Sequence, residues 1–310
     1  MKISVALCTY NGERFLNAQI DSILDQHLAV DEIIICDDGS ADGTLDILNS
    51  YQQKYPDLFR IHSNPNNLKS VKNFEKAIAL CSNDIIFLSD QDDIWEKNKT
   101  ETCISYFHAH PSIMVICSNG YLIDEKGTVQ EQYYTLWDIP ALLDNKNIDY
   151  YHMLATVGNI ATGASMAVRK SFVREIIPFP QIENLHHDEW IAIAAAEQQN
   201  FAFLSEKLFR YRLHADQQVG GVCFPKNASE REKLHHKFDP DYPVRSFRDL
   251  KVTIRTLNDK QKRLEDFLKT QNNQIVKRWL KLIESEKAVF FKKMEKEHPL
   301  YSLFFKYVYR

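Results

Sequence analysis

Glycine is scarce in this chain: nine of 310 residues are about 3%, against a usual share of about 7%. The hydrophobic (44%) and charged (26%) fractions are average, which argues against a collagen-like or a largely disordered chain. No stretch approaches the roughly 18 consecutive apolar residues that a membrane-spanning helix needs. The first residues, MKISVALCTYNGERF, lack a full hydrophobic region and a cleavage site, so we predict no signal peptide.

Closely paired cysteines are also missing. The six cysteines are scattered, and none forms a CxxC pair. Three of them, Cys8, Cys36 and Cys117, lie inside apolar, strand-like runs. We therefore expect neither a disulfide framework nor a zinc site, and the pattern favours reduced, buried thiols in a cytoplasmic protein.

The net charge of −4 hides an uneven distribution. Residues 241–310 hold 17 Lys and Arg against nine Asp and Glu, so this segment carries +8 and the remainder −12. A basic tail on an acidic body suits either nucleic acid or an anionic membrane surface. Because the tail has helical periodicity and no nucleic-acid-binding motif, we expect membrane-surface contact and no nucleic acid partner.

Strand-like and helix-like segments alternate over the first 120 residues. Apolar runs predict strands at 3–8, 32–38, 59–62, 84–90 and 113–118. Periodic segments predict helices over 13–27, 42–55, 70–81 and 96–108. This alternation indicates an α/β fold with βαβ units, right-handed crossovers and a mainly parallel central sheet.

The pattern is less regular from residue 120 onward. We predict a hairpin around Lys126-Gly127, a strand in 159–170, a helix from about His187 and paired strands in 201–214. The polar, proline-punctuated segment 224–245 is a candidate domain boundary.

Residues 246–296 are predicted to be helical. Ile254, Leu257, Gln261, Leu264 and Leu268 are spaced 3, 4, 3 and 4 residues apart, which makes a heptad seam with one polar position. Such a seam can pack back onto the body, form a dimer interface or face a membrane, and the spacing leaves all three open.

The strongest chemical signal is the run Asp90-Gln91-Asp92-Asp93 directly after the apolar segment IIFLS. A strand that ends in three carboxylates places them at the sheet edge where open α/β sheets bind ligands. Clustered carboxylates repel one another unless a cation or hydrogen bonds compensate, and hard oxygen ligands suit Mg²⁺ or Mn²⁺. A cap for the following helix is the alternative, but a cap needs one carboxylate only.

Two further loops follow strands at the same predicted edge. CDDGSADGT (36–44) has glycines for a tight turn and a carboxylate able to bind a base or a ribose. It matches neither the Walker A nor the GxGxxG pattern. TYNG (9–12) ends the first strand. Three polar loops at one sheet edge indicate a ligand site.

Together these segments resemble glycosyltransferase family 2, the inverting enzymes with a GT-A nucleotide-sugar-binding fold. The matching segments cover residues 3 to about 221 and are ISVALCTYNGERFL, EIIICDDGSADGT, FLSDQDDIW, TGASMAVRK, HDEW and YRLHADQQVGG. The last motifs resemble the rhamnosyltransferase-like branch of bacterial surface-polysaccharide synthesis. The resemblance implies a GT-A fold with a C-terminal helical extension.

The resemblance also implies a donor site. Its nucleotide-sugar-binding residues are expected to be Thr9, Tyr10, Asn11, Asp38, Lys69, Asn73, Asp90, Gly163 and Arg212. Thr9 and Asp38 would hold the base and ribose, and Asp90 would contact the ribose. Lys69 stands where the family commonly has glycine, which puts the local turn geometry in question.

A divalent cation, Mn²⁺ or Mg²⁺, is the implied cofactor. Asp92 would be the principal ligand, Asp93 would lie near the metal or the donor sugar, and His214 would complete the metal shell. Arg212, two residues before His214, would contact the diphosphate.

Inverting transfer needs a carboxylate that takes the proton of the acceptor hydroxyl. The family pattern assigns this role to Asp188 in HDEW, with Glu189 as the alternative. Neighbours at a helix start point about 100° apart, so only one is expected to face the cleft.

We therefore expect a metal-dependent transferase that moves rhamnose or another hexose from a dTDP- or UDP-linked donor to a saccharide or lipid-linked acceptor. The catalytic domain would span 1–225, with a nucleotide-sugar half (about 1–120) and an acceptor half (about 121–225). Residues 226–310 would form the basic helical region. The expected location is the cytoplasm, peripherally on the cytoplasmic face of the inner membrane.

Two other functions were considered. A nucleotidyltransferase that forms nucleotide sugars would need a glycine-rich, basic first loop, whereas TYNGER has one glycine and one arginine. A binding module without catalysis would not need the full acidic set of Asp38, Asp90, Asp92, Asp93 and Asp188.

Overall fold

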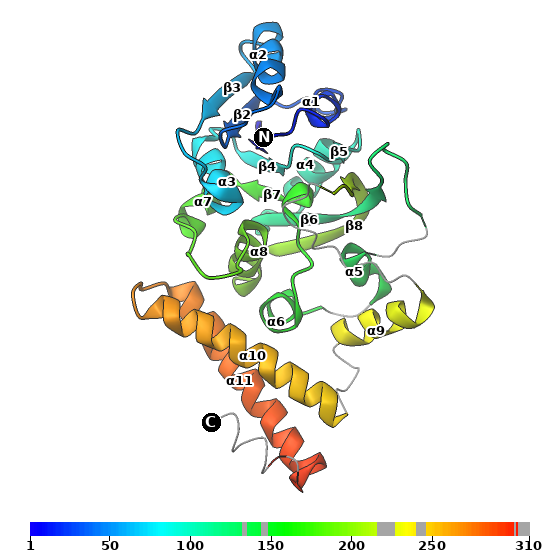
Figure 1. Cartoon of the computed structure of the whole chain (residues 1–310), viewed down its shortest axis with the longest axis vertical. Helices are drawn as coiled ribbons and strands as arrows, with labels where there is room; N and C mark the ends of the chain where they lie inside the picture. The colour runs from blue at the N-terminus through cyan, green and yellow to red at the C-terminus, as the bar shows by residue number, and fades with distance from the viewer. Residues whose placement is uncertain (132–134, 144–147, 216–226, 240–245, 301, 303–310) are drawn as a thin grey trace.

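The computed structural model describes residues 1–131, 135–143, 148–215, 227–239, 246–300 and 302 (Figure 1). Within them an eight-stranded sheet has the order β3-β2-β1-β4-β7-β6-β8-β5. Its strands are β1 (Ile3–Thr9), β2 (Glu32–Asp37), β3 (Phe59–Ser63), β4 (Ile85–Ser89), β5 (Ile94–Trp95), β6 (Val115–Ile123), β7 (Ala167–Arg169) and β8 (Phe201–Arg212).

Parallel pairing dominates this sheet, as predicted. β1 lies between β2 and β4, β2 pairs with β3, and β6 pairs with β8, all in parallel. The short strands β7 and β5 run antiparallel to their neighbours. Every residue of β1, β2 and β4 is buried, which is the pattern of strands covered on both faces.

Helices cover both faces of the sheet (Figure 1). The helices of the body are α1 (Leu16–Leu24), α2 (Thr44–Lys54), α3 (Lys69–Leu80), α4 (Lys99–Ala109), α5 (Ile139–Leu142), α6 (Tyr150–His152), α7 (Lys170–Ile176), α8 (His187–Glu197) and α9 (Ala228–Phe238). One hydrophobic cluster joins α1, α2 and α4 to the sheet, and the other joins α3, α7 and α8. Val5 and Leu7 of β1 belong to the first cluster and Ala6 and Cys8 to the second, because successive side chains of a strand point to opposite faces.

Two segments differ from the sequence prediction. Residues 201–214 hold one long strand, β8, instead of a strand pair; β8 hydrogen-bonds to β6 on one side and to β5 on the other. The strand expected in 159–170 is confined to β7, because Gly163–Ser165 forms a 3₁₀ turn. The predicted hairpin at Lys126-Gly127 is present, with Ile123 bridging Val129 in antiparallel fashion.

The C-terminal helices α10 (Phe247–Leu268) and α11 (Gln274–Glu297) form a hairpin next to the body (Figure 1). Ile254, Leu257 and Leu264 of the predicted heptad seam are at most 1% exposed. Leu257 and Leu264 lie in the same core cluster as α8. The seam therefore packs inside the chain, so these three side chains are not available to a membrane or to a second copy.

Of the candidate boundary segment 224–245, the structure describes residues 227–239, and Phe238 at the end of α9 lies in the same core cluster. The five cysteines in the described part of the chain are buried and free; Cys223 lies outside it. No helix among the described residues is long and apolar enough to cross a membrane.

Candidate active site

A cavity of about 750 Å³ opens at the carboxyl ends of β1, β2 and β4. The loops after these strands form one wall, and residues 159–163 with the start of α8 form another. Of the predicted donor-site residues, those that line the cavity are Thr9, Tyr10, Asn11, Asp38, Asn73, Asp90 and Gly163. Asp92, His214 and Asp188 line it too, whereas Lys69, Asp93 and Arg212 do not.

Asp37 organises the loops after β1 and β2. Its Oδ1 accepts from the backbone N–H groups of Gly39 and Ser40, at 3.2 and 3.0 Å. Its Oδ2 accepts from the hydroxyls of Thr9, at 2.8 Å, and Ser40, at 2.6 Å. Gly39 has a φ of +86°, a left-handed conformation that favours glycine. The Thr9 hydroxyl is thus engaged in holding the loop.

The Asp38 carboxylate is also held by hydrogen bonds within the protein. It accepts from the side-chain amide of Asn64 and from the backbone N–H groups of Leu68 and Lys69, at 2.7–2.8 Å. Lys69 reaches this position through a left-handed backbone, φ 63°, a conformation that favours glycine. The Asn73 side chain donates to the Cys36 carbonyl at 2.8 Å. Asp38 and Asn73 therefore shape the cavity floor, and Lys69 acts through its backbone.

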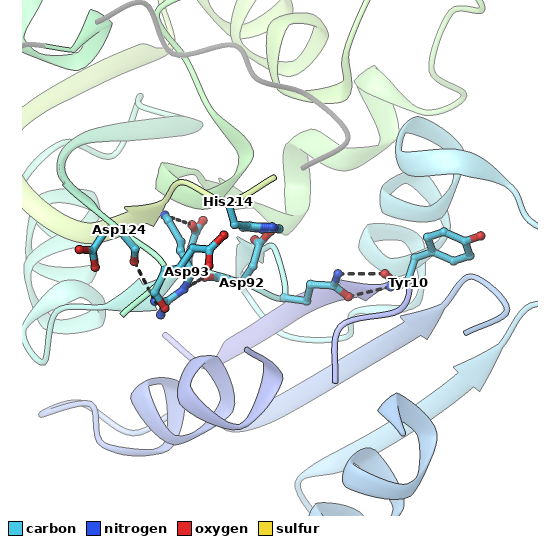
Figure 2. A network of polar contacts seen from close by, with 8 residues as sticks. Tyr10, Asp92, Asp93, Asp124 and His214 are labelled. Carbon is cyan, nitrogen blue, oxygen red and sulfur yellow. Dashed lines mark hydrogen bonds and ion pairs between the residues drawn. The ribbon is translucent and has the colours of Figure 1, made fainter. Parts of the chain in front are cut away.

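Gln91, which the sequence analysis did not single out, supports the first loop. Its side-chain amide accepts from the Tyr10 N–H at 2.7 Å and donates to the Tyr10 carbonyl at 2.9 Å (Figure 2). A Cβ at Gly12 would lie only 2.3 Å from the Gln91 Oε1. A side chain at position 12 would therefore have to displace the Gln91 amide from its two hydrogen bonds to Tyr10.

Two of the three predicted metal ligands lie side by side in the cavity wall, and the third does not. Asp92 Oδ2 and His214 Nε2 lie 2.8 Å apart in the cavity wall (Figure 2). The Asp93 carboxylate instead turns into the protein, where its Oδ1 accepts from the Arg212 N–H at 3.0 Å. Within the described residues, no three His, Cys, Asp or Glu side chains form a group able to hold a metal ion.

Arg212 also differs from its predicted role. Its guanidinium donates to the backbone carbonyls of Asp92, Asp124 and Glu125, at 2.8–3.2 Å. Arg212 is 3% exposed and stacks over the ring of Phe15, 4.6 Å from the centroid. It therefore ties the acidic loop to the turn after β6 and does not face a diphosphate.

Burial and mutual repulsion raise the pKa values of Asp90 and Asp93 in the acidic cluster. Burial, with Asp92 and Asp188 nearby, raises the pKa of Asp90 to about 7. Burial also raises the pKa of Asp93 well above its ordinary value. Lys99 is buried beneath the cluster, where its ammonium donates to the Ala164 carbonyl at 2.5 Å and burial lowers its pKa to about 8. A bound cation would therefore stabilise the ionised form of these carboxylates.

A divalent cation fits this donor set. Asp92 supplies a hard carboxylate oxygen and His214 an imidazole nitrogen, and both line the cavity beside Asp90. Mg²⁺ and Mn²⁺ sites that bind phosphates commonly use only one or two protein ligands, because the phosphates and water supply the rest. Two residues are therefore enough for a cation that arrives with a diphosphate.

The start of α8 brings both candidate bases to the cavity. Asp188 and Glu189 both line it, contrary to the expectation that only one would face the cleft. The Asp188 Oδ1 accepts from the Glu189 N–H at 2.6 Å. Burial raises the pKa of Glu189, which also lines a second, small pocket against Lys260 of α10. Glu189 thus stands between the cavity and the C-terminal hairpin.

His187 forms the wall behind Gly163. Its ring stacks on Phe74 with 4.0 Å between centroids, and its two ring nitrogens are buried without a hydrogen-bond partner. Burial lowers the His187 pKa to about 4, so the ring is neutral at pH 7. A Cβ at Gly163 would lie 2.6 Å from the His187 Nε2. Gly163 is thus required by packing.

Arg14, which the sequence analysis did not single out, lines the cavity. Of the Lys and Arg residues that the structure describes, only Arg14 lines the cavity. Arg14 pairs with Glu125 at 2.5 Å and lies over the ring of Phe15, which contacts the His214 ring with centroids 4.9 Å apart. Arg14 is therefore on the same side of the cavity as the Asp92–His214 pair.

Comparison with known proteins places this site in a family. Residues 4–177 match the family described as glycosyl transferase family 2. The chain is 32% identical over 126 residues to the putative glycosyltransferase EpsE of Bacillus subtilis, covering 41% of this chain and 45% of EpsE. It is 27% identical over 233 residues to the dTDP-rhamnosyl transferase RfbG of Shigella flexneri, covering 69% of this chain and 73% of RfbG. The match thus spans less than half the length of EpsE.

Solved structures support the fold. S. aureus TarS 1–349 in complex with UDP-GlcNAc superposes with a TM-score of 0.55 at 15% identity, over 96% of this chain and 73% of that one. The mannosyltransferase PcManGT from Pyrobaculum calidifontis, in complex with GDP-Man and Mn²⁺, gives 0.54 at 11% identity, over 96% and 88%. Since the family match covers more than half of the sequence and the observed fold agrees with it, the chain belongs to glycosyl transferase family 2.

Proposed function

We propose that this chain is an inverting glycosyltransferase that moves a sugar from a nucleoside diphosphate sugar to an acceptor hydroxyl. The observation that carries the proposal is that one cavity brings together Asp92 and His214, the Arg14 guanidinium and the carboxylate of Asp188. These are the groups that binding a diphosphate and deprotonating a hydroxyl require.

The reaction is a single in-line displacement. The acceptor oxygen bonds to the anomeric carbon while the bond from that carbon to the diphosphate oxygen breaks. Asp188 takes the proton of the acceptor hydroxyl. Arg14 leaves its exposed pair with Glu125 to bind the diphosphate oxygens. Asp92 and His214 would hold the Mn²⁺ or Mg²⁺, which when bound neutralises the charge that grows on the leaving diphosphate.

Asp188 is proposed as the base in preference to Glu189. Glu189 also lines the small pocket that Lys260 and Arg263 of the C-terminal hairpin help to form, so it contacts the hairpin as well as the cavity. The family pattern in HDEW, which assigns the base to Asp188, supports this choice.

The donor is proposed to be dTDP- or UDP-linked and its sugar rhamnose or another hexose. Similarity to the dTDP-rhamnosyl transferase RfbG supports this choice. The acceptor is proposed to be a growing surface polysaccharide or a lipid-linked saccharide. The proposed location is the cytoplasm, and the net +8 of residues 241–310 supports attachment to an anionic membrane surface there.

Donor turnover tests the proposal. Purified protein with Mn²⁺ is incubated with dTDP-rhamnose, UDP-glucose or UDP-GlcNAc, with and without a saccharide acceptor, and release of the nucleoside diphosphate is followed. We expect release from one donor, and we expect Asp188→Asn to lower it by about 10²- to 10⁴-fold. Glu183→Gln, an exposed change before α8, is the matched control. Equal rates for Asp188→Asn and wild type would contradict the assignment of the base.

A further inference from the structure

Both helices of the C-terminal hairpin donate a hydrogen bond to the same backbone carbonyl of the body. Residues Met153–Val157 form a π-helical turn, and the Ala155 carbonyl accepts from the Lys260 ammonium at 3.0 Å and from the Trp279 indole N–H at 3.1 Å. Lys260 belongs to α10 and Trp279 to α11. Both helices of the hairpin therefore hold the segment that runs directly into the cavity wall at 159–163.

Lys260 also lies against the start of α8. A pocket of only about 10 Å³ lies between the hairpin and α8, lined by Lys260, Arg263, Trp279 and Glu189. Glu189 also lines the main cavity. The positive charge of Lys260 opposes the rise that burial causes in the Glu189 pKa. Arg263 donates to the Glu183 carbonyl at 2.8 Å, just before α8.

The hairpin holds two more points of the same region. Arg278 of α11 forms a two-pronged ion pair with Glu197 at the last residue of α8, with Nη2 and Oε2 2.8 Å apart. His152, directly before the π-helical turn, pairs with Glu286 of α11 at 3.2 Å. The contacts thus fall on both ends of α8 and on the segment that leads into 159–163.

We propose that the C-terminal hairpin is a positioning element of the active site, and that Lys260 is its main positioning residue. By holding Ala155 and facing Glu189, Lys260 fixes the wall at 159–163 and the first turn of α8, which carries Asp188. The hairpin then sets the acceptor side of the cavity, whereas the loops after β1, β2 and β4 set the nucleotide side. This inference rests on the proposed function only in naming Asp188 as the base.

The test compares Lys260→Met, which keeps the length of the side chain, with Lys260→Arg, which keeps the charge. Lys262→Met, an exposed lysine on the same helix, is the control. Hydrogen exchange is measured on peptides covering 153–163 and 187–197, with 32–63 as an internal reference. UDP or dTDP with Mn²⁺ is titrated into each variant, and donor turnover is measured.

We expect Lys260→Met to speed exchange at 153–163 and 187–191 by about fivefold or more and to leave the reference unchanged. We expect its turnover number to fall about tenfold while nucleotide affinity stays within about twofold. Lys260→Arg should restore at least part of the turnover, and Lys262→Met should match wild type.

Wild-type exchange and turnover in Lys260→Met would overturn the inference, as would an equal loss of nucleotide affinity and turnover. If Lys260→Met does not fold, Trp279→Phe removes the other donor to Ala155 and is expected to speed the same exchange; wild-type exchange there would overturn the inference. If wild type binds no nucleotide, the proposed function fails, but the exchange comparison still decides the positioning role.

Discussion

Gly163 and His187 offer a sharp test of how the cavity wall is packed. Replacing Gly163 by alanine would place a Cβ 2.6 Å from the His187 Nε2, closer than the 3.0 Å that real Cβ atoms respect. The imidazole has little room to retreat, because it is 6% exposed and stacks on Phe74 at 4.0 Å. The nearest Asp90 oxygen, at 3.6 Å, is at ordinary contact distance. The strain should therefore fall on His187.

The expected magnitude follows from these distances. Overpacking a rigid core costs about 1–3 kcal/mol, and the lower backbone entropy of the unfolded alanine chain offsets roughly 0.5 kcal/mol of this. Gly163 does not have a left-handed φ, so alanine adds no backbone strain. We expect Gly163→Ala to lower the free energy of unfolding by about 1–2 kcal/mol.

Urea unfolding of four proteins measures this: wild type, Gly163→Ala, His187→Ala and the double variant. Removing the imidazole removes the collision, so in the His187→Ala background Gly163→Ala should cost about zero. The predicted interaction energy is about 1–2 kcal/mol in favour of the double variant. An equal cost of Gly163→Ala in both backgrounds would refute the packing argument.

Other predictions concern the base, the metal ligand and pH. Asp188→Asn should leave the affinity for UDP with Mn²⁺ unchanged in calorimetry, whereas Glu189→Gln should reduce turnover by no more than about tenfold. Asp92→Asn should abolish the stabilisation of the fold by UDP that depends on Mn²⁺, measured as a thermal midpoint; a retained shift would count against Asp92. The hydrogen bond that the His152 ring donates to the Glu286 carboxylate raises the pKa of His152, so the folded chain binds this proton more tightly than the unfolded one. The stability it contributes is fully present below about pH 6.5, the unfolded pKa, and is lost as pH rises through the folded pKa. In wild type the urea midpoint should therefore fall as pH rises through this range, and His152→Gln should make that fall smaller. An equal fall in both proteins would contradict the contribution of His152.

The sequence predicted the sheet edge well, because the signals there are local. Buried strands show as uninterrupted apolar runs, and a polar loop directly after such a run has to lie at the carboxyl edge of a parallel sheet. This argument located Thr9, Asp38, Asp90 and Asp92 in one cavity. The polar residues within 201–214 suggested a turn between two strands. Most of them lie instead at exposed or partly exposed positions of the single strand β8.

The direction of a side chain is not a local property. Asp93 and Arg212 carry the charges expected of a metal ligand and a diphosphate-binding cation. The Asp93 carboxylate instead accepts from the Arg212 backbone N–H, and the Arg212 guanidinium donates to backbone carbonyls. Arg14 lines the cavity with its guanidinium over the ring of Phe15, and no local pattern marks this direction. Contacts such as Lys260 with Ala155 join residues 105 positions apart, and no sequence period marks them.

The most direct test of the central claim is calorimetric titration of wild-type protein with UDP and with dTDP, in Mn²⁺ and in EDTA. If Asp92 and His214 complete a metal site with the diphosphate, one nucleotide should bind at least about tenfold more tightly with Mn²⁺. Binding of neither nucleotide, or equal binding in Mn²⁺ and in EDTA, would contradict the account.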